Sequence, residues 1–483
     1  MNRAINYQRF PSQDEVWKWQ TTMQDFGPRL TGSAGHQRLI NYFADELQNL
    51  GLEVHRDTYH LRHRWEARRW GIWAKTENGF EEIPTTSYYP YSGQTPPEGI
   101  EAELVYCPGG ADDFAKACGK IAIIDVNAGV VPTSFLFTPR TLYPSDLTVA
   151  DPFRCVVLTA RPDLRAAAEA GVLGVICVWQ NLADDNAMGQ EFPFDTPLQN
   201  CPALWVGTKT GERLKSLADH HTGARLVLEA NVEEQAPTDT LYAVLPGQNL
   251  RETILITTHT DGPNATEENG GVGLLALAQY FAAQPPSERK RTLVFVFASG
   301  HFQIPELGIE DDGQATTLWL HDHPELWDGK GEHARALAAL TIEHLGCLEW
   351  KDDADHSRYE FTGQVDIEYV YTGNDAMAQL YVDCLQDRKK VRAALLKPAA
   401  DELYYGEGHT LWGVGVTTIS FLGVPDYLLA LKPSGDIEKL DPELLYEQIE
   451  TCAEVVSRLD TMSPAEIGQN AYKNPEFPSR QFC

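Results

Sequence analysis

The chain has 483 residues, which is long enough for two or three domains with separate cores. Hydrophobic residues make up 43% of the sequence and charged residues 22%, an ordinary balance for a globular protein. Lys and Arg number 39 against 69 Asp and Glu, so the formal net charge is −30. An acidic surface of this kind repels phosphate backbones, and we therefore expect no nucleic-acid partner.

The N-terminal segment and the cysteines indicate the compartment. The first eleven residues lack the apolar core of a signal peptide, and no apolar run approaches the ~20 residues that cross a bilayer. Nine cysteines are scattered between Cys107 and Cys483 without a Cys-x-x-Cys pair, which is typical of buried free thiols in a reducing compartment. We expect a cytoplasmic protein that does not bind membranes.

The first half of the chain predicts one helix and a separate module. Residues 34–50 place apolar side chains at helical spacing and end at Gly51, after the turn-rich segment 26–33. Residues 96–235 differ in character, with β-rich runs at 120–126, 172–179 and 225–230, a helical stretch at 163–170 and a Pro-rich loop at 127–150. We expect residues 96–235 to form a compact α+β module inserted into a larger domain.

From about residue 240 the chain alternates strands and helices, which is the pattern of a mostly parallel sheet flanked by helices. The predicted strands are residues 253–257, 292–297, 336–342 and 416–421, and a helix is predicted at 271–281 after a glycine-rich turn. The sequence therefore predicts an α/β fold in three segments. Residues 1–95 and 236–483 form the main domain, and residues 96–235 form the insertion.

Polar residues follow several of these strands, and open parallel sheets bind ligands at the carboxyl ends of their strands. His259 and Asp261 follow strand 253–257; residues i and i+2 of an extended segment share a face, so the Asp261 carboxylate can orient the imidazole. The other candidates are Glu267 and Glu268 before the helix, Glu343 after strand 336–342, and His409 in a glycine-rich loop. Imidazole and carboxylate ligands suit zinc, manganese or cobalt, and a bridging carboxylate can hold two ions.

Each candidate taken alone has a more ordinary interpretation. A single histidine at a strand end is more often a hydrogen-bonded polar residue than a metal ligand. An acidic pair at the start of a helix commonly offsets the helix dipole. Convergence at one edge of the sheet is what favours a metal site.

In this order the motifs resemble those of the co-catalytic zinc aminopeptidases, whose superfamily includes glutamate carboxypeptidase, glutaminyl cyclase and the catalytically silent transferrin receptor. The resemblance is carried by residues 26–33 (FGPRLTGS), 255–261 (LITTHTD), 265–271 (ATEENGG) and 341–346 (TIEHLG). The insertion at 96–235 resembles the protease-associated domain of many members. The resemblance implies a zinc-exopeptidase-like fold over nearly the whole chain.

The resemblance also implies a role for each candidate. His259 would bind the first metal, with Asp261 behind it as the orienting carboxylate. Glu343 stands where the family has an aspartate on the first metal, and His409 stands where it has a histidine on the second. The carboxylate side chains at Glu267 and Glu343 are both one methylene longer than the aspartates of the family, which would change the spacing of the metal site or its preference for a metal.

The bridging position and the general base depart from the family pattern. Glu267 takes the place of the bridging aspartate, and a one-residue gap would put Glu268 there instead. After the strand at 292–297 the family has Glu-Glu, as general base and second-metal ligand, whereas this chain has His301 and Phe302. A phenyl ring cannot bind a metal. The imidazole of His301, with an ordinary pKa near 6.5, suits proton transfer at neutral pH or replacement of a ligand.

The sequence therefore predicts a metal-dependent hydrolase that cleaves an amide or peptide-like bond with a metal-activated water and His301 as an atypical general base. We expect one or two divalent ions, zinc before manganese or cobalt, and a small-molecule or peptide-like substrate. Two alternatives stay open: a single-metal enzyme with cyclase, lyase or isomerase chemistry, and a catalytically silent binding protein. The role of the insertion and a homo-oligomeric state are also left open.

Overall fold

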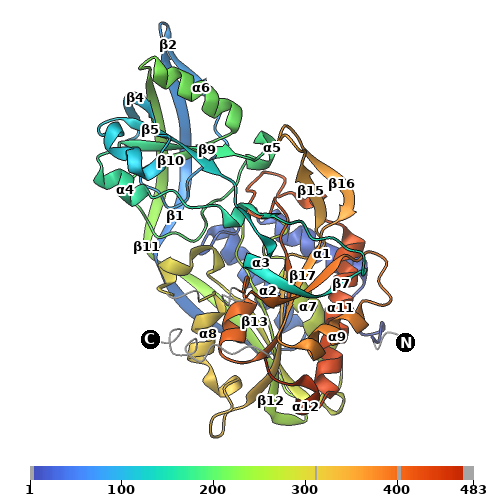
Figure 1. Cartoon of the computed structure of the whole chain (residues 1–483). Helices are drawn as coiled ribbons and strands as arrows, with labels where there is room; N and C mark the ends of the chain where they lie inside the picture. The colour runs from blue at the N-terminus through green and yellow to red at the C-terminus, as the bar shows by residue number, and fades with distance from the viewer. Residues whose placement is uncertain (1–4, 310–312, 400–403, 471–483) are drawn as a thin grey trace.

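The computed structural model describes residues 5–309, 313–399 and 404–470. Within these ranges the protein forms a main body and a smaller lobe, at the bottom and the top of Figure 1. Two long antiparallel strands, β1 (Val54–Thr76) and β11 (Gly223–Leu245), run through both parts. They join the strands of the body and of the lobe into one hydrogen-bonded sheet.

The centre of the body is a mostly parallel sheet, as predicted. Its four central strands, in spatial order, are β13 (Arg291–Ala298), β12 (Asn249–His259), β14 (Arg335–Glu343) and β19 (Thr417–Gly423). Adjacent strands in this group are parallel. Their continuous apolar runs are buried, which is typical of parallel strands covered by helices on both faces. The sheet continues through β17 (Glu368–Thr372) and β18 (Ala393–Pro398).

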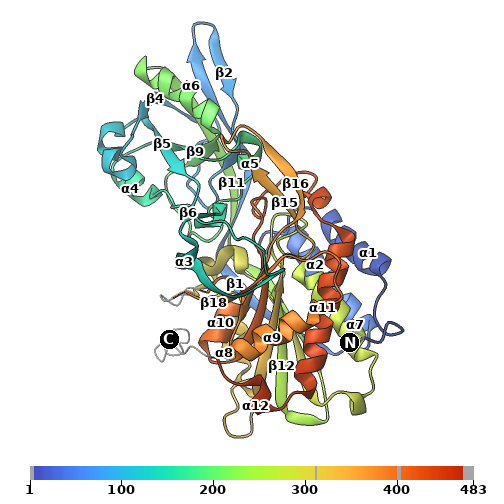
Figure 2. The ribbon, with the colours of Figure 1, turned by 45° about the vertical axis from the view of Figure 1, so that its right-hand side comes forward.

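Helices cover both faces of this sheet. One apolar core packs the sheet against α1 (Gln13–Asp25), α2 (Ala34–Asn49), α7 (Gly270–Ala282), α9 (Asp375–Cys384) and α11 (Pro442–Thr461). A smaller core on the other face includes side chains of α8 (Thr316–Asp322) and α10 (Gly408–Gly413). Figure 2 shows α7 and α11 to the right of the central strands and α8 and α10 to their left. The helices predicted at 34–50 and 271–281 are thus confirmed.

The lobe has an apolar core on each side of its own parallel strands. These strands are β4 (Ile100–Tyr106), β5 (Ile121–Asn127), β9 (Gly174–Gln180) and β10 (Ala203–Val206). Helix α4 (Leu164–Glu169) packs on one face and α6 (Thr208–Asp219) on the other. Because the second core also takes in Trp65 and Ile72 of β1, the lobe uses residues that precede position 96. The domain boundaries and the likeness to a protease-associated domain stay predictions.

The segment predicted as a loop at 127–150 is partly a strand. After β6 (Val130–Val131) and α3 (Thr133–Leu136), strand β7 (Phe137–Tyr143) pairs antiparallel with β18 at the edge of the body sheet. Prolines indicate a loop in sequence, but an edge strand tolerates a proline because one of its sides makes no ladder hydrogen bonds. The insertion therefore folds back onto the body.

The remaining strands and α-helices are short. They are β2 (Gly79–Ile83), β3 (Ser87–Tyr88), β8 (Phe153–Arg154), β15 (Leu348–Asp352), β16 (Tyr359–Val365), α5 (Asp184–Ala187) and α12 (Pro464–Ile467). The described part of the chain holds eight cysteines, all free thiols, of which only Cys118 is exposed. Among the described helices none is long and apolar enough to cross a bilayer. The cytoplasmic location stays a prediction.

We predict that Glu191→Gln stabilises the protein at alkaline pH. Burial raises the pKa of Glu191 from 4.5 to about 7, although a hydrogen bond with Tyr88 favours the ionised form. Below pH 4.5 this carboxyl is protonated in both the folded and the unfolded state, and its raised pKa does not affect the free energy of unfolding. Between pH 4.5 and 7 the raised pKa lowers the free energy of unfolding progressively, and above pH 7 the loss reaches its full value of up to about 3 kcal/mol. Urea denaturation at pH 4.5 and pH 8 should show the gain only at pH 8.

The exposed Glu234 provides the control for this prediction, because Glu234→Gln should change stability little at either pH. An equal gain from Glu191→Gln at both pH values would contradict the assigned protonation state.

Candidate metal centre

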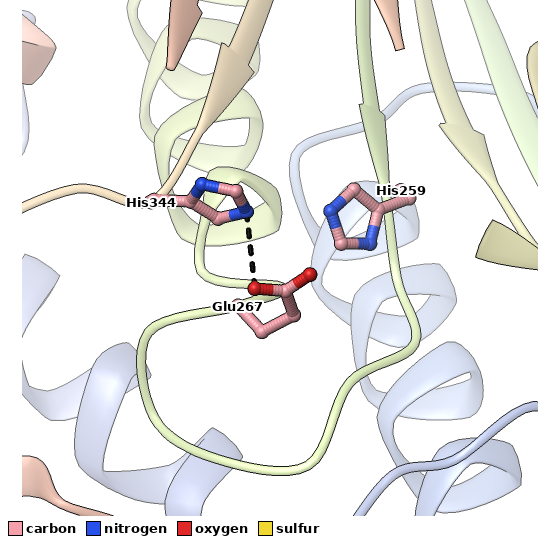
Figure 3. A group of neighbouring side chains, drawn as sticks. All are labelled: His259, Glu267 and His344. Atoms are coloured by element: carbon pink, nitrogen blue, oxygen red, sulfur yellow. Dashed lines mark ion pairs between the residues drawn. The ribbon is translucent and has the colours of Figure 1, made fainter. Parts of the chain in front are cut away.

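Side chains from separate elements meet at the carboxyl edge of the parallel sheet. His259 is the last residue of β12, and Glu343 is the last residue of β14. Glu267 lies in the turn before α7, and His344 follows β14 directly. His259, Glu267 and His344 are buried, and one ligand atom of each lies within 4.8 Å of the others (Figure 3). The edge therefore collects imidazole and carboxylate groups in one place.

The atoms that face one another are nitrogens and oxygens without hydrogen-bond partners. His344 Nε2 lies 3.2 Å from Glu267 Oε2, the ion pair dashed in Figure 3, and His259 Nε2 lies 3.6 Å from Glu343 Oε2. All four atoms are buried and make no hydrogen bond of acceptable geometry with the described residues. Buried polar atoms are nearly always satisfied, so four orphaned atoms on adjacent side chains fit a bound cation. Two imidazoles and two carboxylates are donors that zinc takes.

The outer nitrogens of the two histidines are held by the backbone. His259 Nδ1 donates to the carbonyl oxygen of Asp261 at 3.0 Å, and His344 Nδ1 donates to the carbonyl oxygen of Gly423 at 2.6 Å. A proton fixed on Nδ1 leaves the lone pair of Nε2 directed at the centre. Burial and the neighbouring His301 also lower the pKa of His259 to about 3, which keeps its imidazole neutral. Neutral imidazole is the form that binds a metal.

His344 was not among the predicted ligands. In a regular strand, consecutive side chains point to opposite faces, so the residue after Glu343 is expected to point away from it. His344 instead has a φ of +59°, an uncommon value for a residue other than glycine, and the strand ends there. This left-handed conformation brings His344 into the group with His259 and Glu267. In the sequence, only its position next to Glu343 at the end of the strand pointed to His344 as a member of this group.

Asp261 orients a loop and not the imidazole of His259, so the predicted carboxylate–imidazole contact is wrong. Its carboxylate accepts hydrogen bonds from Thr31 Oγ1 at 2.5 Å, from the backbone N–H of Gly300 at 3.0 Å and from that of Phe302 at 2.8 Å. The backbone carbonyl of Asp261 makes the contact with His259. The acidic side chain therefore fixes the loop that carries His301.

The structure separates the two glutamates that the sequence left as alternatives. Glu267 lies in the buried group of three. Glu268 lies outside this group, and its Oε1 forms a buried ion pair with Arg29 Nε. Arg29 belongs to the turn-rich segment before α2, so this pair ties the N-terminal segment to the turn that positions Glu267.

His301 packs against the centre through a contact that the sequence did not predict. Its ring stacks on His259 with centroids 4.2 Å apart, and its Nε2 lies 3.9 Å from Glu267 Oε1. Its Nδ1 hydrogen-bonds Glu407 Oε1 at 2.9 Å. Burial opposes the charged form of His301, but Glu407, together with Glu267 and Glu343, outweighs it and raises the pKa to about 10. Glu407 is thus a further candidate site residue, in the glycine-rich loop where only His409 was singled out.

Phe302 and His409 lie beside the centre. Phe302 is buried, and its ring centroid lies 4.9 Å from that of Phe194, a lobe residue. His409 lies in α10 outside the group of three, with its ring centroid 6.1 Å from that of Tyr404. It lines the same cavity as Glu267 and His301. Its role as a metal ligand stays a prediction.

A cavity of about 720 Å³ opens onto the centre. Glu267, His301, Glu343 and His344 line one part of it. Apolar side chains from both parts of the molecule line the rest, among them Leu136, Phe137, Phe153, Leu158 and Phe194 of the insertion and Tyr369, Tyr371, Leu396, Tyr404 and Leu422 of the body. The cavity therefore lies between the body and the segment that folds back onto it.

No protein-family model and no curated protein matches the chain, whereas solved structures do. A zinc aminopeptidase from Bacillus subtilis matches with a TM-score of 0.63 and 16% identity over 95% of this chain and 98% of its own. A peptidase M28 precursor from Shewanella amazonensis matches with a TM-score of 0.62 and 15% identity over 93% and 97%. An aminopeptidase from Aneurinibacillus sp. matches with a TM-score of 0.56 and 16% identity over 93% and 94%.

These matches extend over nearly the full length of each chain, so they cover the lobe as well as the body. At such low identity a structural likeness establishes the architecture and leaves the reaction to the site. The predicted resemblance is confirmed at this level, and the chain has the fold of the zinc aminopeptidases and M28 peptidases.

Proposed function

We propose that the protein is a metal-dependent hydrolase of an amide or peptide-like bond, with zinc as the preferred ion. The observation that carries the proposal is the set of four buried atoms on His259, Glu267, Glu343 and His344 that face one another and make no hydrogen bond with the described residues. Buried carboxylates are costly without a compensating charge, and a divalent cation supplies it. The aminopeptidase fold around this set supports an enzyme of the same broad class.

The four side chains would hold the ion through two Nε2 atoms and two carboxylate oxygens. When bound there, zinc would supply Lewis-acid polarisation of the scissile carbonyl and would lower the pKa of a nearby water. Manganese and cobalt also take imidazole and carboxylate ligands. The backbone carbonyls of Asp261 and Gly423 keep both histidines in the tautomer that this role requires.

We further propose that His301 replaces the glutamate base of the related enzymes and that Glu407 is its positioning residue. The hydrogen bond to Glu407 occupies Nδ1 of His301 and leaves Nε2 on the side of Glu267. Glu407 is itself fixed by the backbone N–H groups of Ala315 and Thr316 at 3.1 and 3.0 Å. Glu407 favours protonated His301 most strongly, and Glu267 and Glu343 add to its effect. An ion held by Glu267 and Glu343 would offset the contribution of these two carboxylates and so would favour a His301 that can accept a proton at Nε2.

We predict that His344→Ala and His259→Ala each lower zinc affinity by more than roughly 100-fold, since an outer contact alone is typically worth 10–100-fold. Elemental analysis and chelator competition on the purified protein measure the effect. His301→Ala should keep its metal. Circular dichroism of each variant establishes that the fold is retained.

The ion count separates the alternatives. Two ions per chain would favour a co-catalytic hydrolase, and one ion with no hydrolysis of aminoacyl or peptide substrates would favour cyclase, lyase or isomerase chemistry. A wild-type protein without zinc after reconstitution would contradict the proposal and favour a binding protein.

We predict that His301→Ala lowers kcat by roughly 10²–10⁴-fold, the usual range for a proton-transferring group, while zinc content stays unchanged. Glu407→Gln should lower kcat less, because the side chain can still accept a hydrogen bond from Nδ1 but no longer carries a charge. It should leave KM unchanged and shift the pH profile of kcat. A fall in zinc content with His301→Ala would instead make His301 a ligand.

A further inference from the structure

Arg161 is the one arginine or lysine among the described residues that line the cavity. It lies between the short 3₁₀ turn at Val156–Leu158 and α4, so it comes from the insertion. Its Nη2 donates a hydrogen bond to Asp195 Oδ2, and the side chain is 46% exposed. Within the described ranges its other guanidinium nitrogens make no hydrogen bond, so they remain available to a ligand.

The Arg161–Asp195 pair is tied to the side of the cavity that carries His301. Phe194, next to Asp195 in the chain, stacks on the His301 ring with centroids 5.6 Å apart. The carbonyl oxygen of Phe194 also accepts a hydrogen bond from Gln303 Nε2 at 3.1 Å. The guanidinium group of Arg161 therefore lies in the same cavity as the candidate metal centre.

The remaining wall presents apolar surface. Two of the four tyrosines among the described lining residues turn their hydroxyls to protein partners: Tyr371 donates to the carbonyl oxygen of Leu136 at 3.2 Å, and Tyr404 donates to Ser420 Oγ at 2.5 Å. Their rings, stacked with centroids 4.4 Å apart, are left to line the cavity. A pocket with apolar walls and a few placed polar groups binds an apolar ligand and orients it through those groups.

We propose that the substrate carries a free carboxylate beside an apolar group, as a short apolar peptide does at its C-terminus, and that Arg161 binds this carboxylate. The proposal rests on the hydrolase function proposed above. Arginine suits the role because its planar N–H groups form paired, charge-assisted hydrogen bonds with a carboxylate. The other charged side chains on the cavity wall are acidic residues and histidines, so among the described lining residues Arg161 alone offers a guanidinium group that can pair with a carboxylate.

Two peptides that share a scissile bond test the proposal: the dipeptide Leu-Phe with a free C-terminus, and the same dipeptide with a C-terminal amide. The zinc-loaded wild type should hydrolyse the free acid with a kcat/KM roughly 10–100-fold higher, the range for a hydrogen bond to a charged group. Arg161→Gln should remove this preference by slowing the free acid only, and Arg161→Lys should keep part of it.

The matched control is Arg213→Gln, which removes an exposed arginine of the same lobe that pairs with Glu81 away from the cavity. It should leave both rates unchanged. Equal rates for the two peptides in the wild type, or an equal loss for both with Arg161→Gln, would overturn the proposal, because a structural role lowers both.

A binding measurement separates this proposal from the hydrolase function. Calorimetry should show that 3-phenylpropanoate binds the zinc-loaded wild type at least 10-fold more tightly than it binds Arg161→Gln, whereas 3-phenylpropanamide binds both equally. Arg161-dependent binding without hydrolysis of either peptide would keep the anion site and contradict the hydrolase function. Binding of 3-phenylpropanoate that does not depend on Arg161 would reject the anion site, even if both peptides are hydrolysed.

Discussion

The arrangement of the site depends on one constraint, which is the burial of several ionisable groups at the carboxyl edge of a parallel sheet. A buried charge is stable only when opposite charges or hydrogen bonds compensate it. Backbone carbonyls and amides compensate the outer atoms here, through Gly423 on His344 and through Gly300 on Asp261. The inner atoms of His344 and Glu267 face one another and keep unused bonding capacity. The outer contacts make the group rigid, and the inner atoms leave a place for a cation.

The insertion contributes to the same site by closing it. Strand β7 joins the edge of the body sheet beside β18, and this pairing brings apolar residues of the insertion over the cavity. A second attachment lies at Arg154, which donates hydrogen bonds to Asp352 at 2.7 Å and to Asp426 at 2.5 Å. All three of these side chains are mostly buried, so the ion pairs are shielded from salt. The β7–β18 pairing and the ion pairs of Arg154 thus both attach this wall of the cavity to the body.

His301 and Phe302 stand where the resembled family has a Glu-Glu pair, and the residues around them fit an imidazole and a phenyl ring. Phe302 joins the apolar cluster of the lobe and contacts Phe194, so the position no longer offers a metal ligand. His301 gains Glu407 as a hydrogen-bond partner and stacks on His259. A histidine with an attached carboxylate can transfer a proton as a lone carboxylate does. Under the function proposed here, His301 would be the group in the altered motif that carries out the acid–base chemistry.

The sequence by itself determined the four central strands of the body, the helices at 34–50 and 271–281, and the meeting of His259, Glu267 and Glu343 at one edge. Those features follow from local periodicity and from the rule that parallel strands end together. It did not determine the places of His344 and Glu407. The first depends on a left-handed backbone at one residue, and the second on a hydrogen bond between loops 106 positions apart in the chain. It also predicted a loop where β7 pairs with a distant strand. Contacts of this kind form only when the chain is folded, because no local pattern of residues specifies them.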